Sequence, residues 1–336
     1  MIVVCSAGCA AQYSSANESI LARVRAAGVL RCGIDAEEAE YTTSDDHGNR
    51  EAFDADLCRA VAVAVLGRDA PTRVTHYPDD RAAMQGINAG DVEMVATLSD
   101  DFTHTVGTHL RFTQPVLWDG VGFLVLAQTP AMRARQLSGK KICFLAETTV
   151  EESVRAWFAR EHLEFVAFPF QEEGEMQAAF ATGNCGALAG DRTRLAETRA
   201  EFTRRGRLTR LLPETISHDP LAASVREDDP QWATIVNWVM EALIQAEESG
   251  VTQANVNARR ARADSDPVLR FLLGGSREVG GALGLDDDWA ARVIAATGNY
   301  GEIYERDLGS GSAMKLPRGE NNLRAHGGAI TALPFK

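Results

Sequence analysis

Apolar positions along the chain alternate between the spacing of a strand and the spacing of a helix. Residues 30–36, "LRCGIDA", are typical of a strand. The helical pattern follows in "DADLCRAVAVAVLG", where apolar side chains recur four positions apart behind an acidic first turn: Leu57, Val61 and Val65. Strand and helix patterns then continue through residues 72–78, 79–90 and 91–98. This alternation predicts an α/β sheet.

A second alternating unit begins after residue 130 and ends near residue 220. A strand pattern in residues 139–147 leads into a helical pattern in residues 148–162. The same rhythm continues through residues 163–170, 172–183 and 185–191. Beyond it, residues 230–250 form a long helical pattern whose apolar side chains keep helical spacing: Trp232, Val236, Val239 and Leu243. We therefore expect two α/β units and a long helix.

Two stretches are typical of crossings between these units, because each carries strand-like apolar residues beside turn formers. They are residues 119–130, "DGVGFLVLAQTP", and residues 211–225, "LLPETISHDPLAASV". A second lobe inserted into a first one follows. The predicted limits are residues 1–18 for a leader or tail, 19–123 with 222–336 for lobe one, and 128–218 for lobe two.

Length and charge restrict the classes of partner. The 336 residues suffice for two domains, and 45% hydrophobic with 24% charged residues is an ordinary globular composition. The net charge of −13 argues against nucleic acid or an anionic membrane as a partner. No apolar run reaches the roughly 18–20 residues of a membrane span. Small molecules or proteins are the expected partners.

The first residues, "MIVVCSAGCAAQYSSANES", are similar to the end of a secretory signal, with an apolar start followed by small and polar residues. "SAGC" also resembles a lipoprotein cleavage box in which Ser6 replaces the usual Leu. A plain unstructured tail is the alternative. We expect export, with lipidation of Cys9 as a further hypothesis.

Cysteine spacing agrees with export. Four cysteines follow the leader, at Cys32, Cys58, Cys143 and Cys185, and their spacing does not match a zinc site. Three pairings are open. Cys32–Cys58 and Cys143–Cys185 each stay local, and we favour these two bridges in an oxidising compartment. Four buried thiols in a cytosolic protein are the alternative.

Several stretches together resemble the general L-amino-acid-binding proteins of bacterial ABC importers, which are periplasmic two-lobed receptors of the polar amino-acid family. The resemblance covers roughly residues 19–336. The stretches are "LRCGIDAEEAEYTTSDDHGN", "FDADLCRAVAVAVLG", "QWATIVNWVMEALIQAEESGVTQANV" and "DDWAARVIAATGNYGEIYERDLGSGSAMKLPRG". The last two, a long helix and a C-terminal extension, separate this subfamily from shorter receptors.

The resemblance implies a type II fold, in which two crossing strands join the lobes and a ligand is held between them by hinge closure. In this family an acid at a strand end of lobe two binds the ligand ammonium, and Asp191 matches it. Thr148 and Thr149 match the hydroxyls at a helix start, where an anion is favoured. Tyr41 matches the aromatic cover. For Asp191 and the two threonines, the alternative role is to cap the helices that begin there. For Tyr41, the alternative is an exposed position in a loop.

The segment "ATLSDDFTHTVGTHLRF", residues 96–112, departs from the family pattern. His104 stands where the family carries the Arg that clamps the α-carboxylate, and Asp100 and Asp101 precede it. An imidazole lacks the bidentate fork of a guanidinium. Arg111 matches a position beyond the clamp. We therefore expect weak binding of free amino acids and a ligand with amino or guanidino groups.

Further acids near the same predicted cleft favour a cationic ligand. They are Asp35, Glu37, Glu38 and Glu40, for which surface charge is the alternative. His104 and His109 are five apart, which does not match a zinc-binding helix, and no cofactor or metal is expected.

The predicted function is that of a periplasmic solute-binding receptor, a monomer that works with an ABC permease in the inner membrane and is not an enzyme. A sensory or interaction module without transport is one alternative. A periplasmic dehydratase-like enzyme on the same fold is another, because fold does not fix function. The missing arginine argues against the enzyme, whose substrates carry two carboxylates.

Overall fold

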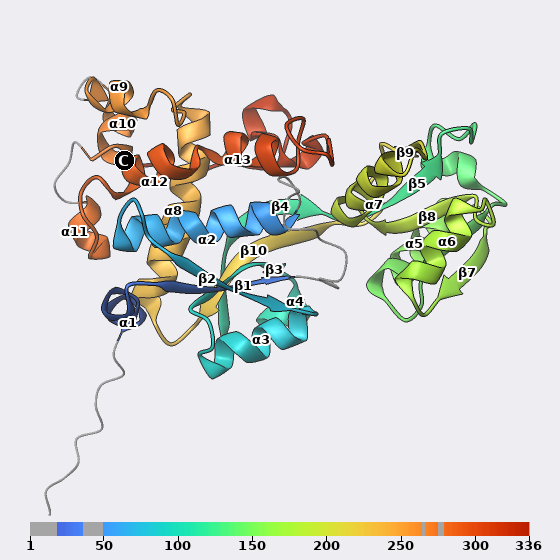
Figure 1. The fold of residues 1–336 in the computed structure, drawn as a ribbon, viewed down its shortest axis with the longest axis horizontal. Coiled ribbons are helices and arrows are strands. Elements are labelled where there is room, and N and C mark those ends of the chain that lie inside the picture. Colours follow the sequence, from blue (N-terminus) through green and yellow to red (C-terminus); the bar gives the residue numbers. More distant parts are fainter. Residues whose placement is uncertain (1–18, 36–49, 264–265, 275–278, 336) are drawn as a thin grey trace, which may run out of the picture.

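The computed structural model describes residues 19–35, 50–263, 266–274 and 279–335. Figure 1 shows an elongated molecule with one sheet toward each end and the chain passing between them twice. We call the two parts lobe one, built on the sheet that contains β1, and lobe two, built on the sheet that contains β6. The predicted α/β class is confirmed.

Lobe one contains a five-stranded sheet in the order β2-β1-β3-β10-β4. β1 pairs in parallel with β2 and β3, and β10 runs antiparallel between β3 and β4. The strands are β1 (Leu30–Asp35), β2 (Thr72–Tyr77), β3 (Met94–Ser99), β4 (Leu110–Asp119) and β10 (Asp219–Arg226). The helices are α1 (Ile20–Ala27), α2 (Arg50–Leu66), α3 (Asp80–Ala89), α4 (Phe102–Thr105), α8 (Pro230–Glu248), α9 (Val256–Arg260), α10 (Pro267–Leu272), α11 (Val279–Leu283), α12 (Trp289–Thr297) and α13 (Tyr300–Asp307), with short 3-10 turns at Gly319–Asn321 and Arg324–His326.

Lobe two repeats this topology in the order β7-β6-β8-β5-β9. β6 pairs in parallel with β7 and β8, and β5 runs antiparallel between β8 and β9. The strands are β5 (Val121–Leu126), β6 (Lys141–Leu145), β7 (Val166–Phe170), β8 (Ala187–Asp191) and β9 (Thr209–Leu211). The helices are α5 (Thr149–Arg160), α6 (Glu173–Ala181) and α7 (Arg192–Arg204), with a 3-10 turn at Ala134–Leu137.

Local sequence explains where these elements begin and end. Asp79 accepts the backbone N–H of Ala82 and so caps α3, which ends at Gly90 in the left-handed conformation with φ 79°. Asp229 caps α8 in the same way, with Pro230 in its first turn. The expected helices are confirmed within a few residues, except that α2 begins at Arg50, four positions before the predicted start.

The core of lobe one is one large apolar cluster on one face of its sheet. There α2 and α8 pack on β1 and β3, and the helices after α8 join the same cluster. Four of its aromatic side chains are almost fully buried: Trp232, Trp289, Tyr300 and Tyr304. A smaller cluster on the other face contains Ala83 and Ile87 of α3. The C-terminal extension is therefore part of the folded body of lobe one.

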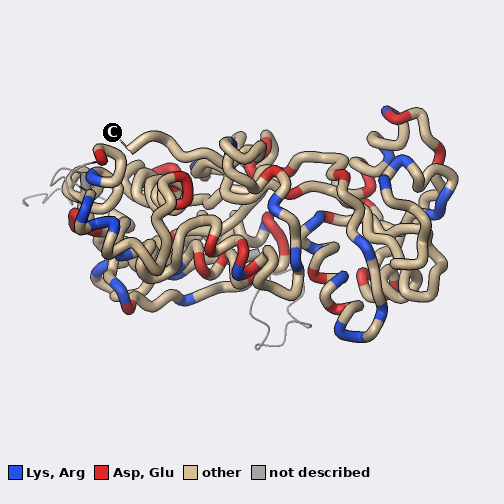
Figure 2. Tube along the Cα trace, turned by 90° about the horizontal axis from the view of Figure 1, so that it is seen from above, with Lys and Arg blue, Asp and Glu red and all other residues tan. Residues whose placement is uncertain are grey.

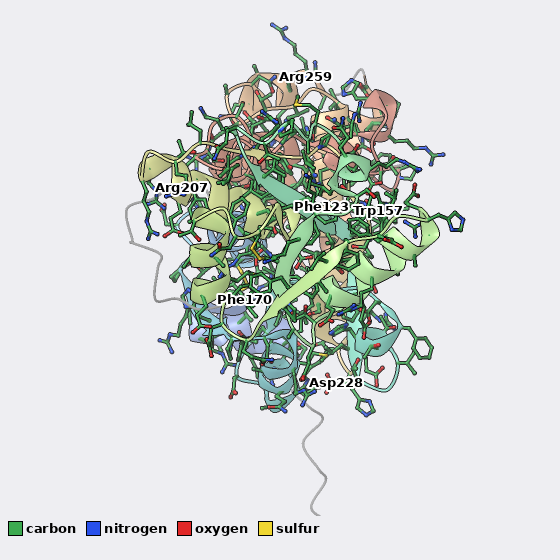
Figure 3. The ribbon with its side chains drawn as sticks, turned by 90° about the vertical axis from the view of Figure 1, so that its right-hand side faces the viewer. Phe123, Trp157, Phe170, Arg207, Asp228 and Arg259 are labelled. Atoms are coloured by element: carbon green, nitrogen blue, oxygen red, sulfur yellow. A yellow bond between two sulfur atoms is a disulfide. The ribbon has the colours of Figure 1, made fainter. Side chains whose placement is uncertain are left out.

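Lobe two has a separate cluster on each face of its sheet. On one face Phe144 packs with Trp157 and Phe158 of α5, and the Phe123 and Trp157 rings lie 5.9 Å apart between centroids (Figure 3). On the other face α6 and α7 cover the sheet. Each cluster is smaller than the lobe-one cluster, which makes lobe two the lighter of the two packing units.

Both predicted disulfides are confirmed. Cys32 and Cys58 join β1 to α2, and Cys143 and Cys185 join β6 to the turn before β8, with Cα separations of 6.1 and 5.8 Å. Each bridge lies within one lobe. Neither bridge therefore restrains one lobe directly against the other.

The chain passes from lobe one to lobe two at Asp119–Val121 and returns between residues 212 and 218. Gly120 lies at the first passage with φ 141°, and a Cβ atom there would lie 2.4 Å from the carbonyl oxygen of Ser217 on the returning chain. Only glycine fits this close approach. The residue limits predicted for the lobes remain a prediction.

Among the described helices, none combines the length and the apolar character that a bilayer span requires. Figure 2 shows acidic and basic residues interspersed along the tube in both lobes.

Candidate functional site

The strand ends that carry the predicted ligand residues meet where the lobes join. Ser99, the last residue of β3, pairs with Leu221 of β10, and Asp219 pairs with Asp119 at the end of β4. Asp191, the last residue of β8, pairs with Val121 just past the first crossing. Ligands of open α/β sheets bind beyond the carboxyl ends of the strands. The ends of β3, β4, β8 and β10 therefore lie at the junction of the lobes.

Thr148 of lobe two holds the start of α5. Its hydroxyl accepts the N–H of Glu151 at 3.4 Å and donates to the carbonyl oxygen of Leu145 at 2.8 Å. Thr149 is the first residue of the helix and its side chain is exposed. The capping alternative is therefore observed for Thr148, and Thr149 remains accessible at the same helix N-terminus.

Asp191 stands at the N-cap position of α7, but a different carboxylate caps this helix. Asp119, which is 3% exposed, accepts the backbone N–H of Arg192 at 3.0 Å and that of Thr193 at 3.3 Å. The Thr193 hydroxyl donates to the same carboxylate. A residue at the end of lobe one thus holds the lobe-two helix that begins at Asp191, and the capping alternative proposed for the Asp191 carboxylate does not hold.

In lobe one, His104 lies between two carboxylates. Its Nδ1 atom is 2.9 Å from Oδ1 of Asp101, and its Nε2 atom is 3.4 Å from Oδ2 of Asp80. Asp101 also caps the short helix α4 by accepting the N–H of His104. Burial acts to raise the pKa of Asp101, but the backbone hydrogen bond from His104 and the nearness of its imidazole outweigh burial, and the pKa is lowered. His104 is therefore engaged by anions within its own lobe.

Two further carboxyls near this segment are disfavoured as anions. Burial, together with the charge of Asp101, raises the pKa of Asp100. Burial also raises the pKa of Asp219, with added repulsion from Asp119 and Asp101, although the Ser99 hydroxyl donates to it at 3.3 Å. A ligand carboxylate in this place would add to that repulsion, whereas a ligand cation would relieve it.

Arg50 is a cation at the junction that the sequence reasoning missed. Its Nη2 atom donates to Thr97 Oγ1 at 3.3 Å, and its backbone N–H donates to Glu197 of lobe two at 3.2 Å. Its charge also lowers the pKa of Asp219 against the larger effect of burial. The polar residues at the start of α2 could have indicated it, but apolar spacing predicted a helix start four residues too late.

Arg111 lies toward the other end of the lobe-one sheet. It pairs with Val225, whereas Leu117 pairs with Leu221, the partner of Ser99. Six residues of strand span about 20 Å. Arg111 is therefore not positioned to replace the missing clamp.

The remaining predicted residues are only partly visible. Asp35 is the last residue of β1, and its backbone pairs with Tyr77; its side chain lies outside the described residues. Tyr41, Glu37, Glu38, Glu40 and Cys9 also lie outside the described residues. Among the His, Cys, Asp and Glu residues that are described, no group of three is arranged to hold a metal ion.

Comparison with known proteins places these features in context. The chain is 37% identical over 331 residues to the general L-amino acid-binding periplasmic protein AapJ of Rhizobium johnstonii, covering 96% of this chain and 94% of the relative. It is 34% identical over 324 residues to the glutamate/glutamine/aspartate/asparagine-binding protein BztA of Rhodobacter capsulatus, covering 96% and 95%.

The structure is similar to that of an ABC transporter/periplasmic binding protein from Brucella ovis with glutathione bound. The TM-score is 0.79 at 32% identity, over 95% of this chain and all of the other. A scan against protein-family models found no match. The relatives share the length of this chain, its C-terminal extension included.

Proposed function

This chain belongs to the amino-acid-binding periplasmic proteins of ABC transporters, and we propose that its ligand is an amine-bearing solute whose α-carboxylate is masked or absent. The ligand would lie at the junction of the lobes. Asp191 would accept its ammonium from lobe two, beside Thr148 and Thr149. The acids around Asp100 and Asp101 would face its other end.

The position of His104 carries this proposal. An arginine in this loop would offer a planar fork of donors to a carboxylate, whereas His104 lies between Asp80 and Asp101. Its two ring nitrogens therefore face anions of the protein. The raised pKa values of Asp100 and Asp219 point the same way, because they mark a place where further negative charge is unfavourable.

The glutathione-bound relative supports a ligand other than a free amino acid, because glutathione is a tripeptide with two amide bonds. Glutathione also keeps free carboxylates. A second candidate is therefore a ligand whose carboxylate is held by Arg50, whose guanidinium donates to Thr97 of lobe one and whose backbone N–H donates to Glu197 of lobe two.

Calorimetry and thermal shift with a defined panel distinguish these candidates. The panel contains glutamate, glutamine, an amino-acid amide, agmatine, putrescine and glutathione. A bound ligand raises stability by RT ln(1 + [L]/Kd). We expect the amide or the amines to bind and free glutamate and glutamine to bind weakly. Micromolar or tighter binding of glutamate or glutamine, lost in Arg50→Ala, would establish the second candidate instead.

Two substitutions test the roles of the two walls. Asp191→Ala should weaken binding of the amine ligand by roughly 30-fold or more, because it removes a charge-assisted bond at the junction. Asp69→Ala, an exposed acid in the turn between α2 and β2, is the matched control and should leave affinity unchanged. His104→Arg should improve affinity for free amino acids. Equal effects of the Asp191 and Asp69 substitutions would contradict the assignment.

The Rhizobium johnstonii relative is a periplasmic protein and the Brucella ovis relative is an ABC transporter/periplasmic binding protein, and we assign the same compartment to this chain. We further propose that it is a monomer that delivers its ligand to an inner-membrane permease without turning it over. The hinge rotation of residues 128–218 against the rest, and a lipid anchor on Cys9, belong to the same proposal.

A further inference from the structure

Helix α7 belongs to lobe two by its packing. Leu195 and Phe202 are buried in the cluster that covers one face of the lobe-two sheet. The ring of Phe202 stacks on that of Phe180 of α6, with centroids 5.9 Å apart. In a hinge motion of rigid lobes, α7 and Asp191 at its start would therefore move with lobe two.

A neighbouring face of the same helix contacts lobe one. Ala196 is fully buried and belongs to the large apolar cluster of lobe one. Arg199, three residues later on the same face, donates from Nη2 to the carbonyl oxygen of Lys315 at 3.0 Å and to that of Met314. One helix is thus shared between two cores that belong to different lobes.

The segment that receives Arg199, residues 309–316, is firmly attached to lobe one. Met314 and Leu316 are 1% and 5% exposed in the lobe-one core. The Ser312 hydroxyl donates to the carbonyl oxygen of Gly309 at 3.0 Å and accepts the N–H of Met314 at 3.1 Å. The N–H of Leu316 donates to the carbonyl oxygen of Leu308 at 2.8 Å. These bonds hold the two acceptor carbonyls in place beside α7.

We propose that residues 309–316 of the C-terminal extension form a brace that fixes α7, and with it Asp191, relative to lobe one. Asp119 holds the N-terminus of the helix and Arg199 holds its middle turn. Arg199 is then a positioning residue for the Asp191 carboxylate. In the hinge rotation proposed for residues 128–218, α7 would then stay with lobe one and the remainder of the segment would turn about it. Only the consequence for ligand affinity depends on the proposed ligand site.

Hydrogen exchange of the ligand-free protein tests the brace. Arg199→Ala should accelerate amide exchange in α7 and in residues 309–316 roughly tenfold, because the two charge-assisted bonds between the helix and this segment are lost. Arg199→Lys retains one flexible donor and should give an intermediate effect. Arg205→Ala is the matched control, since Arg205 lies at the end of the same helix and pairs with Glu201.

Helix α8 is the internal reference in these experiments. Faster exchange confined to α7 and residues 309–316 supports the brace. Unchanged exchange in α7, an equal effect of Arg205→Ala, or equal acceleration in α8 overturns it. With a ligand identified from the panel, Arg199→Ala should also weaken its Kd about three- to tenfold, with a faster dissociation rate. If the unmodified protein binds no member of the panel, the ligand proposal fails, while the exchange result still decides on the brace.

Discussion

The two lobes have the same sheet topology and different surroundings. In each, the first three strands of the sheet are parallel, the fourth is antiparallel to them and the fifth is parallel to them again, in the orders β2-β1-β3-β10-β4 and β7-β6-β8-β5-β9. In lobe one, a large apolar cluster that the C-terminal helices complete covers one face of the sheet, and a smaller cluster covers the other face. Lobe two covers its sheet with two smaller clusters. The same sheet topology therefore forms the centre of a larger packing unit in lobe one and of a smaller one in lobe two.

Two ion pairs differ between the lobes in the same direction, because the pair in lobe one is largely buried and the arginine of the pair in lobe two is exposed. Arg318 of lobe one forms a bidentate pair with Glu247, at 2.5 and 3.1 Å, and its guanidinium lies 5.3 Å from the ring centroids of Tyr300 and Tyr304. In lobe two, Arg135 pairs with Glu161 on the surface. The C-terminal extension thus adds a largely buried ion pair to lobe one. It also accepts the hydrogen bonds of Arg199 and so contacts helix α7 of lobe two.

The largest expected effect comes from the disulfides. We expect each pair of Cys→Ala substitutions, at Cys32 and Cys58 or at Cys143 and Cys185, to lower the free energy of unfolding by roughly 3–4 kcal/mol. The reason is that the unfolded chain has more conformational entropy without the bridge. Sequence separations of 26 and 42 residues predict nearly equal losses in the two lobes. Urea unfolding of the two double variants measures this. A loss below about 1 kcal/mol in either would contradict the chain-entropy account.

The buried ion pair should rank next. Arg318→Ala leaves Glu247 without its partner in a largely buried place and should lower the free energy of unfolding by about 3 kcal/mol. Arg135→Ala is the matched control in lobe two, because the Arg135 side chain is 64% exposed whereas the Arg318 side chain is 13% exposed. The control should cost less than about 1 kcal/mol. Similar losses in urea unfolding would mean that the two lobes do not differ in this respect.

The smallest effect is a pH dependence confined to lobe one. Burial and the charge of Asp56 raise the pKa of Asp307 to about 7. A carboxyl that holds its proton more tightly in the folded state stabilises the protein at low pH, and this contribution is lost as pH rises toward and through 7. Asp307→Asn mimics the protonated form.

The stability advantage of the variant over the unmodified protein should therefore grow by roughly 1–3 kcal/mol between pH 5 and pH 8. Urea unfolding at the two pH values gives the comparison. A variant that is less stable than the unmodified protein at pH 8 would show that the Asp307 carboxylate is stabilising.

Some features of the site were predictable and others were not. The strands that end at Ser99 and Asp191 could be predicted from apolar spacing, and the family resemblance added the expectation that Asp100 and Asp191 lie near a ligand. Arg50 was missed, because helix prediction from apolar spacing begins at the first apolar turn and α2 starts one turn earlier with polar residues. The capping of α7 by Asp119 was also missed, because the two residues that meet there are 73 positions apart.

The α/β class, the favoured pairing of the two disulfides and most of the helix and strand positions could be predicted from the sequence alone. These depend on local spacing, on capping residues and on cysteine separation, which act over short stretches of chain. The three-dimensional packing was needed to show that His104 lies between Asp80 and Asp101, that Arg50 lies at the junction, and that Arg199 bonds to the C-terminal extension. Contacts between distant segments depend on how the sheets and helices pack together, and a periodic pattern carries no record of that packing.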